Sequence, residues 1–430
     1  MSEHIIFRHA LLPDGWAENV RISFANGVIT QVETGHAGGG GIALPGMPNL
    51  HSHGFQRAMA GRAEYRGTGS DSFWTWRTLM YKLALSLDPD DVQAIATLAF
   101  TEMLEAGFTA VAEFHYLHHA PDGTPYADIG EMAARLAAAA ADTGIELLLL
   151  PVFYAHAGFG GQPPVAEQRR FINSLESYEK LYARCKTLAA TGCAPHSLRA
   201  ATMEQIHSLT QLNGTAPFHI HIAEQIAEVE ACLAFSGARP VEYLLSNAAV
   251  SKNWCLVHAT HITPAEAQAM TRANAVAGLC PITEANLGDG IFPSPTFSGA
   301  YGIGSDSNVL IDALRELQLL EYSQRFGQQK RNVMASPSIP ATATSLYHHA
   351  VAGGAQAMGL IPGLCIGAPA SFVTIHGENP DDALADAVFT ARSLSVRDVW
   401  VRGRQVVENG QHALAQKARA GLTNVQRQRL

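Results

Sequence analysis

Histidines and one aspartate recur where the sequence predicts that buried β-strands end. His51 and His53 are two residues apart, and because side chains alternate along a strand, both imidazoles face the same side. His219 and His221 form a second pair of this kind, and Asp306 lies among small residues in a Gly-Ser-Asp-Ser segment. Three imidazoles and one carboxylate from different strands suit a divalent cation such as Zn²⁺ or Fe²⁺.

Repeated strand and helix patterns must position these residues. Helical spacing is clear after Asp88, where apolar residues recur at intervals of three and four between Val92 and Met103. Eight strand candidates end at residues 51–53, 114–116, 153–156, 195–196, 219–221, 257–258, 279–281 and 304–306. This alternation predicts an α/β fold, a (β/α)8 barrel of the TIM type over residues 46–365, whose active site lies at the C-terminal ends of the strands.

Both ends of the chain read as short strands outside this repeat. Residues 4–12, 20–24 and 28–33 have strand character, and Ala25-Asn26-Gly27 is a hairpin signal. Strand character returns at 371–376 and at 395–407, which Asn409-Gly410 closes. We therefore predict one small β-sandwich built from residues 1–45 and 366–412, followed by a peripheral helix at 413–430.

Composition excludes several classes of protein. Apolar residues make up 47% of the 430 residues and charged residues 16%, which indicates a globular protein rather than a disordered chain. The formal charge of −9 disfavours nucleic acid and anionic membranes as partners. The six cysteines are scattered without a Cys-x-x-Cys pair, and no apolar segment is long enough to span a bilayer. We expect a cytoplasmic protein with reduced thiols.

Four segments, in this order along the chain, resemble the metal-dependent amidohydrolase superfamily over nearly its whole length. They are Pro-Gly-Met-Pro-Asn-Leu-His-Ser-His at 45–53, His221-x-x-Glu224, Val-His-Ala-Thr at 257–260 and Gly-Ser-Asp at 304–306. Within that superfamily, the chain resembles the formimidoylglutamate deiminases of histidine degradation. The segments that carry this resemblance are 53–61 (HGFQRAMAG), 72–77 (SFWTWR), 114–119 (FHYLHH) and 194–199 (APHSLR).

The resemblance implies hydrolysis of N-formimidoyl-L-glutamate to N-formyl-L-glutamate and ammonia by a homodimer. It places the metal ligands at His51, His53, His221 and Asp306. The superfamily's His-x-x-Glu spacing selects His221 over His219, which we expect to pack. Relatives with two metal ions bridge them through a modified lysine at the end of strand four, but Pro195 and His196 occupy that place here. We therefore expect one divalent ion, with Zn²⁺ preferred over Fe²⁺.

The residue types suit this reaction. A bound cation lowers the pKa of water from about 16 to near 7 and supplies hydroxide at neutral pH. The attacked carbon then bears an amine that must gain a proton to leave as ammonia, and Glu224 is placed to shuttle that proton. Asp306 is expected to accept the proton of the water, and His258 to hold the hydroxide or stabilise the intermediate.

Recognition of a dicarboxylate asks for cationic partners. Arg77 and Arg199 lie in segments that match the family, and guanidinium groups are the best partners for carboxylates. Gln56 and Tyr116 are added donors, and His196 is a further hydrogen-bonding group around the substrate. The structural alternatives are that Arg77 caps a helix, that Arg199 pairs with a glutamate and that Tyr116 only fills the barrel mouth. Trp74 and Trp76 form a lid or pack against a loop, and packing is favoured.

Three other functions remain open. A deaminase of an aromatic base such as guanine or cytosine shares the barrel and the metal, but calls for a stacking ring and amides rather than two arginines. A non-catalytic assembly protein related to dihydropyrimidinase is disfavoured because such relatives usually lack the metal ligands. An amide or lactam hydrolase on the same scaffold is separable by testing for ammonia release.

Overall fold

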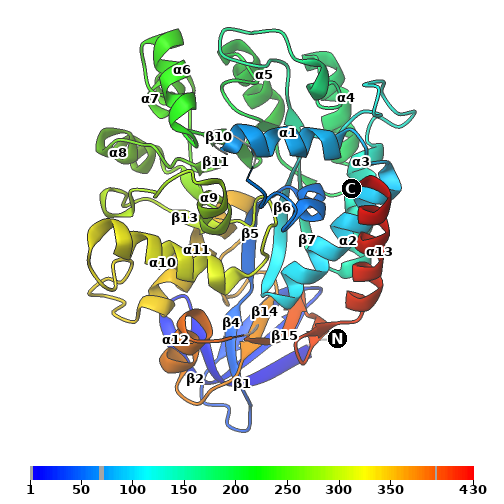
Figure 1. The fold of residues 1–430 in the computed structure, drawn as a ribbon. Helices are drawn as coiled ribbons and strands as arrows, with labels where there is room; N and C mark the ends of the chain where they lie inside the picture. The colour runs from blue at the N-terminus through cyan, green and yellow to red at the C-terminus, as the bar shows by residue number, and fades with distance from the viewer. Residues whose placement is uncertain (1–2, 67–71, 393–394) are drawn as a thin grey trace.

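Parallel strands surrounded by helices form the larger part of the molecule, and a sheet made from both chain ends lies beneath them (Figure 1). The computed structural model describes residues 3–66, 72–392 and 395–430. None of the helices within these ranges is long and apolar enough to cross a lipid bilayer. Figure 1 also shows that helix α13, at the C-terminal end, lies beside α2.

The parallel strands belong to two sheets. Their bounds are β5 Met47–Ser52, β6 Phe108–His115, β7 Glu146–Phe153, β8 Ala190–Thr191, β9 Ala194–Pro195, β10 Phe218–Ile222, β11 Trp254–His258, β12 Val276–Leu279 and β13 Tyr301–Ile303. One sheet runs from β5 to β8, with β9 also on β7, and the other runs from β10 to β13. Single parallel bridges join their edges, between Cys193 and Phe218 and between Ser52 and Asp306. Each strand candidate therefore corresponds to an observed strand, except that the fourth is split in two.

The split in the fourth strand has a steric cause. Gly192 lies between β8 and β9, and a Cβ atom there would be 2.4 Å from the carbonyl oxygen of Pro217. The chain approaches the next strand too closely at this point for regular pairing. This correction leaves the Pro195-His196 end of the strand in place.

Helices follow most of the strands and begin at recognisable caps. Their bounds are α1 Phe73–Ala84, α2 Pro89–Glu105, α3 Glu131–Thr143, α4 Leu175–Cys185, α5 Met203–Asn213, α6 Ile226–Ser236, α7 Pro240–Asn247, α8 Pro264–Ala273, α9 Pro281–Leu287, α10 Ala313–Gln328, α11 Thr342–Met358, α12 Pro380–Phe389 and α13 Ala415–Arg429. Short 3₁₀ turns lie at η1 Gly54–Met59, η2 Ala166–Gln168 and η3 Ser294–Thr296. Asp88 accepts from the backbone N–H of Asp91 and so caps α2, with Pro89 at the first helical position.

Strands from both chain ends share one sheet. Its members are β1 Glu3–Leu12, β2 Gly15–Ala25, β3 Val28–Glu33, β4 Ile42–Pro45, β14 Phe372–Ile375, β15 Val396–Val401, β16 Arg404–Glu408 and β17 Gln411–His412. Strand β14 pairs with β4, which pairs with β1, and this contact joins the two ends. The strand expected at 395–407 is in fact a hairpin, because Arg402 (φ 49°) and Gly403 (φ 78°) form a left-handed turn.

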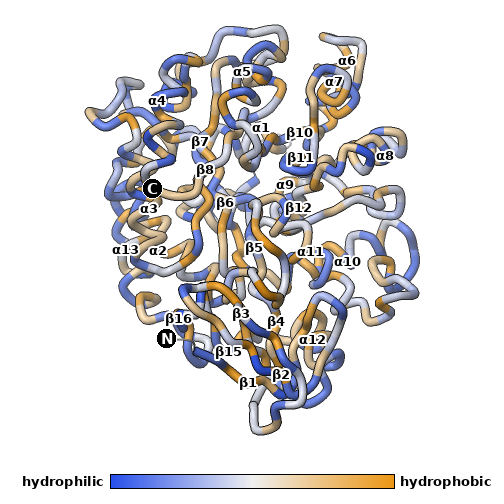
Figure 2. The backbone as a smooth tube through the Cα atoms, turned by 180° about the vertical axis from the view of Figure 1, so that it is seen from behind, coloured by the Kyte–Doolittle hydropathy of each residue, from blue (hydrophilic) through white to orange (hydrophobic). Residues whose placement is uncertain are grey.

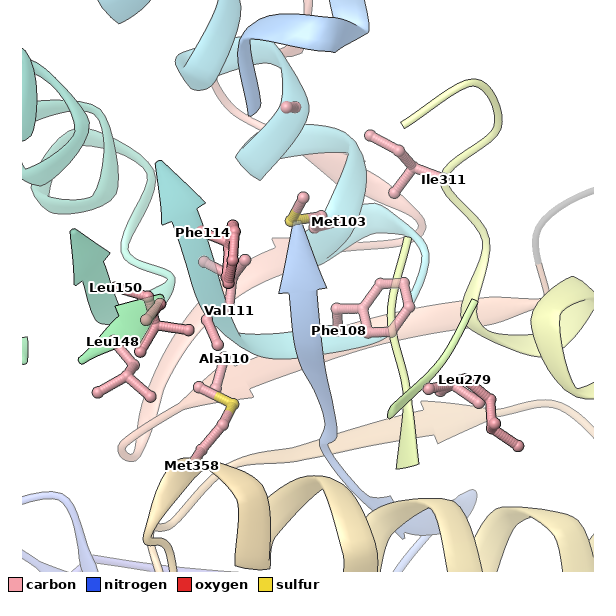
Figure 3. Close-up of a cluster of buried hydrophobic side chains, with 14 of the residues drawn as sticks. Met103, Phe108, Ala110, Val111, Phe114, Leu148, Leu150, Leu279, Ile311 and Met358 are labelled. Atoms are coloured by element: carbon pink, nitrogen blue, oxygen red, sulfur yellow. The ribbon is translucent and has the colours of Figure 1, made fainter. Parts of the chain in front are cut away.

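The interior of the molecule is apolar. Figure 2 shows hydrophobic segments along inner strands such as β5, and Figure 3 shows Ala110 of β6, Leu148 of β7 and Met358 of α11 in one buried cluster. Helix α11 packs most closely where it lies on β13. A Cβ atom at Gly353 would be 1.9 Å from the carbonyl oxygen of Tyr301, so only glycine permits this contact.

Replacing Gly353 by alanine should destabilise the protein although alanine favours helices. The added methyl group must push α11 away from β13, a form of overpacking that costs about 1–3 kcal/mol. Gly421 of α13 is the matched control, because a Cβ atom there has its nearest neighbour at 3.7 Å. Thermal unfolding should show a lower midpoint for G353A and an unchanged or raised midpoint for G421A, where alanine gains up to about 1 kcal/mol. Equal midpoints in the two variants would contradict this packing.

Candidate active site

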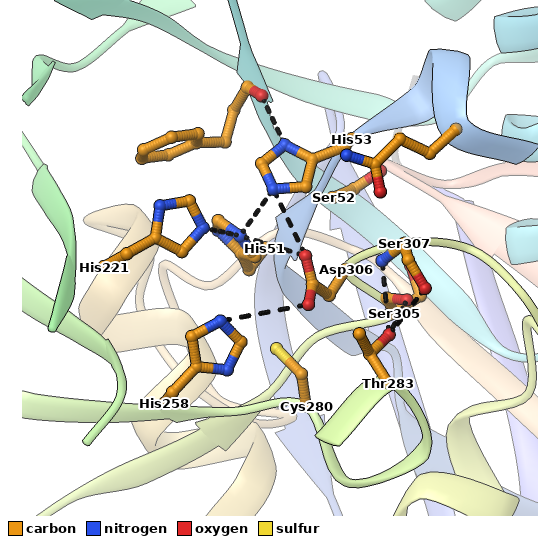
Figure 4. Close-up of polar contacts among 12 residues, drawn as sticks. His51, Ser52, His53, His221, His258, Cys280, Thr283, Ser305, Asp306 and Ser307 are labelled. Atoms are coloured by element: carbon orange, nitrogen blue, oxygen red, sulfur yellow. Dashed lines mark hydrogen bonds and ion pairs between the residues drawn. The ribbon is translucent and has the colours of Figure 1, made fainter. Parts of the chain in front are cut away.

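Four side chains predicted to bind a metal converge at the C-terminal ends of the strands. His51, His53, His221 and Asp306 each offer a ligand atom, and all four atoms lie within 4.8 Å of one another (Figure 4). The Nε2 atom of His51 is 3.2 Å from that of His53 and 2.9 Å from that of His221. The Oδ1 atom of Asp306 is 3.4 Å from Nε2 of His51 and 3.2 Å from Nε2 of His53.

Backbone carbonyls fix the tautomers of two of these histidines. The Nδ1 atom of His53 is 2.8 Å from the carbonyl oxygen of Phe114, and Nδ1 of His221 is 3.0 Å from that of His196. A carbonyl oxygen only accepts hydrogen bonds, so each Nδ1 carries a proton and each neutral ring keeps a lone pair on Nε2. These lone pairs point into one buried space beside a carboxylate, an arrangement that fits a cation.

Burial and charge keep the four groups in the states that bind metals. Burial lowers the pKa of His51 to about 3 and that of His221 well below its usual value, so both rings stay neutral. Burial alone would raise the pKa of Asp306, but hydrogen bonds from His51 and His53 hold it well below its usual value. His51 and His221 are therefore neutral imidazoles and Asp306 is an ionised carboxylate, the forms that coordinate a metal ion.

His219 lies outside this set. Its Nε2 atom is 2.8 Å from the carbonyl oxygen of Ala357, and its side chain is fully buried. The pairs His118–His119 and His348–His349, as well as His261, also lie outside the group of converging ligand atoms that the described residues contain.

Unusual backbone conformations occur where the strands deliver these side chains. Ala223, His258 and Asp306 have φ values of 51°, 68° and 46°, in a left-handed region that residues other than glycine rarely adopt. Asn49 and Asn308 support the turn at Asp306 through hydrogen bonds to the Ser305 side chain at 2.7 and 2.6 Å. Strain of this kind is characteristic of functional sites.

Glu224 and His258 lie beside the four converging groups. The Nε2 atom of His258 is 3.9 Å from Oε1 of Glu224 and 3.9 Å from Oδ2 of Asp306. Burial opposes charge on His258, but Glu224, Glu284 and Asp306 outweigh it and raise its pKa to about 10. Burial raises the pKa of Glu224, which favours a carboxyl group that can carry a proton.

A cavity opens over these groups. All five residues predicted to contact substrate line it, together with residues that the sequence did not single out. The predicted residues are Gln56, Arg77, Tyr116, His196 and Arg199. The sequence-based assignment therefore selected side chains that share one space, although they come from four separate segments.

The two arginines have no acidic partners among the described residues. Within the described ranges neither guanidinium has a carboxylate oxygen within 4.0 Å, although the charges of Glu228 and Glu224 act on Arg199 from a greater distance, and the buried Nε atom of Arg199 has no hydrogen-bond acceptor there. Arg77 stacks on the ring of Trp74 at 4.4 Å, and Arg199 faces the same ring at 5.8 Å. Trp76 packs against the apolar core and also lines the cavity, in agreement with the packing role favoured for it, whereas Trp74 is 39% exposed.

Gln56 and Tyr116 interact with each other. The amide nitrogen of Gln56 donates to the Tyr116 hydroxyl at 2.7 Å, and the buried Oε1 atom of Gln56 has no partner. Gln56 therefore offers an unpaired acceptor among the described residues, and its amide keeps a second N–H beside the one given to Tyr116. Such an acceptor suits an N–H group of a ligand.

Several residues at the site were not recognised from the sequence. Glu284 accepts from Nδ1 of His258 at 3.3 Å and from the backbone N–H of Cys280 at 2.9 Å. Tyr81 and Tyr154 line the cavity. Glu284 could have been found from its place just after the seventh strand candidate. Tyr154 lies at the end of the third strand candidate, and Tyr81 lies in the helix that contains most of the 72–77 segment, but no spacing in the sequence singles out either tyrosine.

Comparisons with known proteins agree with these features. A sequence model of the amidohydrolase family matches residues 42–406, and one described as the formimidoylglutamate deiminase HutF N-terminal domain matches residues 3–42. A formimidoylglutamate deiminase from Pseudomonas aeruginosa is 50% identical over 432 residues, covering 95% of both chains. A 5-methylthioadenosine/S-adenosylhomocysteine deaminase from Thermodesulfovibrio yellowstonii is 25% identical and covers 86% of this chain and 81% of its own.

Solved structures share the fold. The crystal structure of an amidohydrolase from Brucella melitensis has a TM-score of 0.96 and 50% identity, and covers 99% of each chain. An adenosine deaminase from Xanthomonas campestris with bound zinc has a TM-score of 0.77 at 21% identity, with coverage of 99% and 98%. At that identity the likeness concerns the fold alone.

Proposed function

The chain belongs to the amidohydrolase family and, within it, to the formimidoylglutamate deiminases, and from this premise we propose that it hydrolyses N-formimidoyl-L-glutamate to N-formyl-L-glutamate and ammonia in histidine degradation. The observation that carries the proposal is the cavity itself. Two arginines that form no ion pair among the described residues line the same space as the converging histidines and Asp306. A substrate with two carboxylates and a hydrolysable C–N bond matches both features.

We propose that His51, His53, His221 and Asp306 hold one divalent ion. When bound, such an ion lowers the pKa of water and makes hydroxide available near neutral pH. Three nitrogen ligands and one carboxylate favour Zn²⁺, with Fe²⁺ as the alternative. The zinc in the adenosine deaminase from Xanthomonas campestris supports this choice.

The remaining groups would move protons and hold the reacting carbon. Asp306 accepts the proton that the attacking water loses, and Glu224 delivers a proton to the amine, which leaves as ammonia. Glu284 holds Nδ1 of His258, so that Nε2 is free to donate a hydrogen bond to the oxygen on the tetrahedral carbon. Gln56 accepts from a substrate N–H group, and Tyr116 and His196 complete the wall around it.

The substrate carboxylates would bind Arg77 and Arg199. An aromatic base, the main alternative substrate, offers these guanidinium groups no negative charge, and a non-catalytic assembly protein has no use for the converging ligands. The cavity thus supports the dicarboxylate over both alternatives. An amide or lactam hydrolase differs in its products, since it does not release ammonia from a formimidoyl group.

Four further proposals concern the whole molecule. The bridges between the two parallel sheets support a closed (β/α)8 barrel over residues 46–365. The cluster of Phe7, Phe24 and Phe372 supports a terminal sheet, residues 1–45 and 366–412, that curls into a sandwich around its own core. Six free cysteines support a cytoplasmic location. The homodimer rests on the family resemblance, and sedimentation analysis would test it.

The purified protein should release one ammonia per N-formyl-L-glutamate formed from N-formimidoyl-L-glutamate. Changing Glu224 to glutamine keeps the shape of the side chain but removes its titrating carboxyl group, so turnover should fall on the order of 100-fold. Metal content, measured in parallel, should stay near one ion per chain. Near-normal turnover by E224Q with its metal retained would remove Glu224 from the reaction, and ammonia release from guanine instead would favour the aromatic-base alternative.

Replacing His221 by alanine should remove bound metal and activity together. The side chain lies at the strand end, so the fold should persist and circular dichroism should be unchanged. Elemental analysis of H221A should show well below one ion per chain. His219 is the matched control, because H219Q changes the other histidine of the same strand. A variant H221A with full activity and one ion would refute the ligand assignment.

Arg77 and Arg199 should each matter for substrates that carry the matching carboxylate. Replacing either by methionine removes a charge-assisted contact worth about 1.5–3 kcal/mol. One of the two arginines is expected to bind the side-chain carboxylate, which N-formimidoyl-glycine lacks. Replacing that arginine should lower kcat/KM strongly for N-formimidoyl-L-glutamate and much less for N-formimidoyl-glycine. If the ratio of kcat/KM for the two substrates is the same in both variants as in the unchanged protein, the arginines have a structural role.

A further inference from the structure

Two tyrosine hydroxyls and a buried glutamine form a group that the proposed reaction does not use. Tyr81 comes from α1 and Tyr154 follows β7, and both line the cavity. The amide nitrogen of Gln168, in η2, donates to the Tyr154 hydroxyl at 2.8 Å and to the Tyr81 hydroxyl at 3.2 Å. Gln168 itself is only 2% exposed and does not line the cavity.

The orientation of the Gln168 amide is fixed by the backbone. Its Oε1 atom accepts from the N–H group of Val165 at 3.0 Å. A backbone N–H group can only donate, so the oxygen must face Val165 and the NH₂ group must face the two tyrosines. The amide therefore acts as a donor toward both hydroxyl oxygens.

A count of protons shows what the tyrosines offer. Each hydroxyl has one proton, and each oxygen already accepts from Gln168. At most one of the two protons can lie between the two oxygens. At least one hydroxyl must therefore donate elsewhere, and the cavity that both residues line is the space open to it.

The surroundings favour a negatively charged acceptor. The Arg77 guanidinium is 5.4 Å from the centre of the Tyr81 ring and 4.4 Å from that of Trp74, which Arg199 also faces. Burial raises the pKa of Tyr154, so its hydroxyl keeps its proton at neutral pH. The Tyr154 O–H donor thus lies near two guanidinium groups that form no ion pair with any carboxylate of the described residues.

We propose that Tyr81 and Tyr154 are substrate-binding residues that donate hydrogen bonds to a carboxylate held by Arg77 or Arg199, and that Gln168 is the positioning residue that turns their hydroxyls toward it. This inference rests on the proposed function for the identity of the substrate. It also explains a preference for a carboxylate over a carboxamide. The NH₂ group of a carboxamide would face the tyrosine O–H donors, and neither donor group would then have an acceptor. The protein should therefore discriminate N-formimidoyl-L-glutamate from N-formimidoyl-L-glutamine.

Binding of glutarate to the metal-loaded protein tests the group without any turnover. Calorimetry should show that Y81F, Y154F or both bind glutarate more weakly, and that the double variant loses on the order of 10-fold or more, the loss of a hydrogen bond to a charged group. Y182F is the matched control, because its buried hydroxyl donates to Asn213 outside the cavity. With N-formimidoyl-L-glutamate, the loss should appear in KM more than in kcat.

Gln168 calls for a test that reverses its hydrogen bonding. In Q168E, one carboxylate oxygen still accepts from Val165 while the other accepts the tyrosine protons, so binding should weaken as in the Y81F/Y154F double variant. Tyrosine variants that fold but bind glutarate like the unchanged protein would overturn the proposal, as would an unchanged protein that does not bind glutarate. Glutarate binding that depends on the tyrosines, without ammonia release from N-formimidoyl-L-glutamate, would instead refute the proposed function and leave the carboxylate site standing.

Discussion

The converging lone pairs of three buried imidazoles impose the main constraint on this molecule. Lone pairs 2.9 to 3.2 Å apart, beside an ionised carboxylate, need a proton or a cation between them. Carbonyl oxygens of Phe114 and His196 hold two of the rings in the required tautomer. The ends of β5, β6, β9 and β10 must therefore stay in register. The left-handed backbone at Asp306 serves the same purpose, because it directs the Asp306 carboxylate toward the three imidazoles.

The rest of the site divides its charges around this centre. Glu224, Glu284 and Asp306 surround His258 and favour its protonated form, whereas Arg77 and Arg199 form no ion pair with a carboxylate in the part of the chain that the structure describes. A protein that buries charges without pairing them loses stability unless a ligand completes the pairs. The arginines are thus available to pair with substrate carboxylates. The acidic side chains are available to hold the metal ion and to transfer protons.

Strand periodicity predicted the positions of the histidines because alternation and strand ends are local properties of the sequence. The hairpin at Arg402-Gly403 was missed because arginine is an unusual residue in a left-handed turn, whereas Asn409-Gly410 was recognised. The division of the fourth strand depends on how closely Gly192 approaches Pro217, a tertiary contact that no local pattern encodes. The pairing of one Gln56 amide N–H with Tyr116, 60 residues away, is likewise a tertiary contact that no local pattern encodes.

The role of Gln168 could not be predicted from the sequence, for a different physical reason. Its segment is an irregular 3₁₀ turn without a motif, and its role depends on the direction of a hydrogen bond rather than on its type. The backbone N–H of Val165 sets that direction, and the two hydroxyls transmit it to the cavity. Because a donor chain ends on an acceptor, a ligand there must offer oxygen lone pairs and no N–H groups. The polarity of one buried amide thus limits which functional group the cavity can accept beside its arginines.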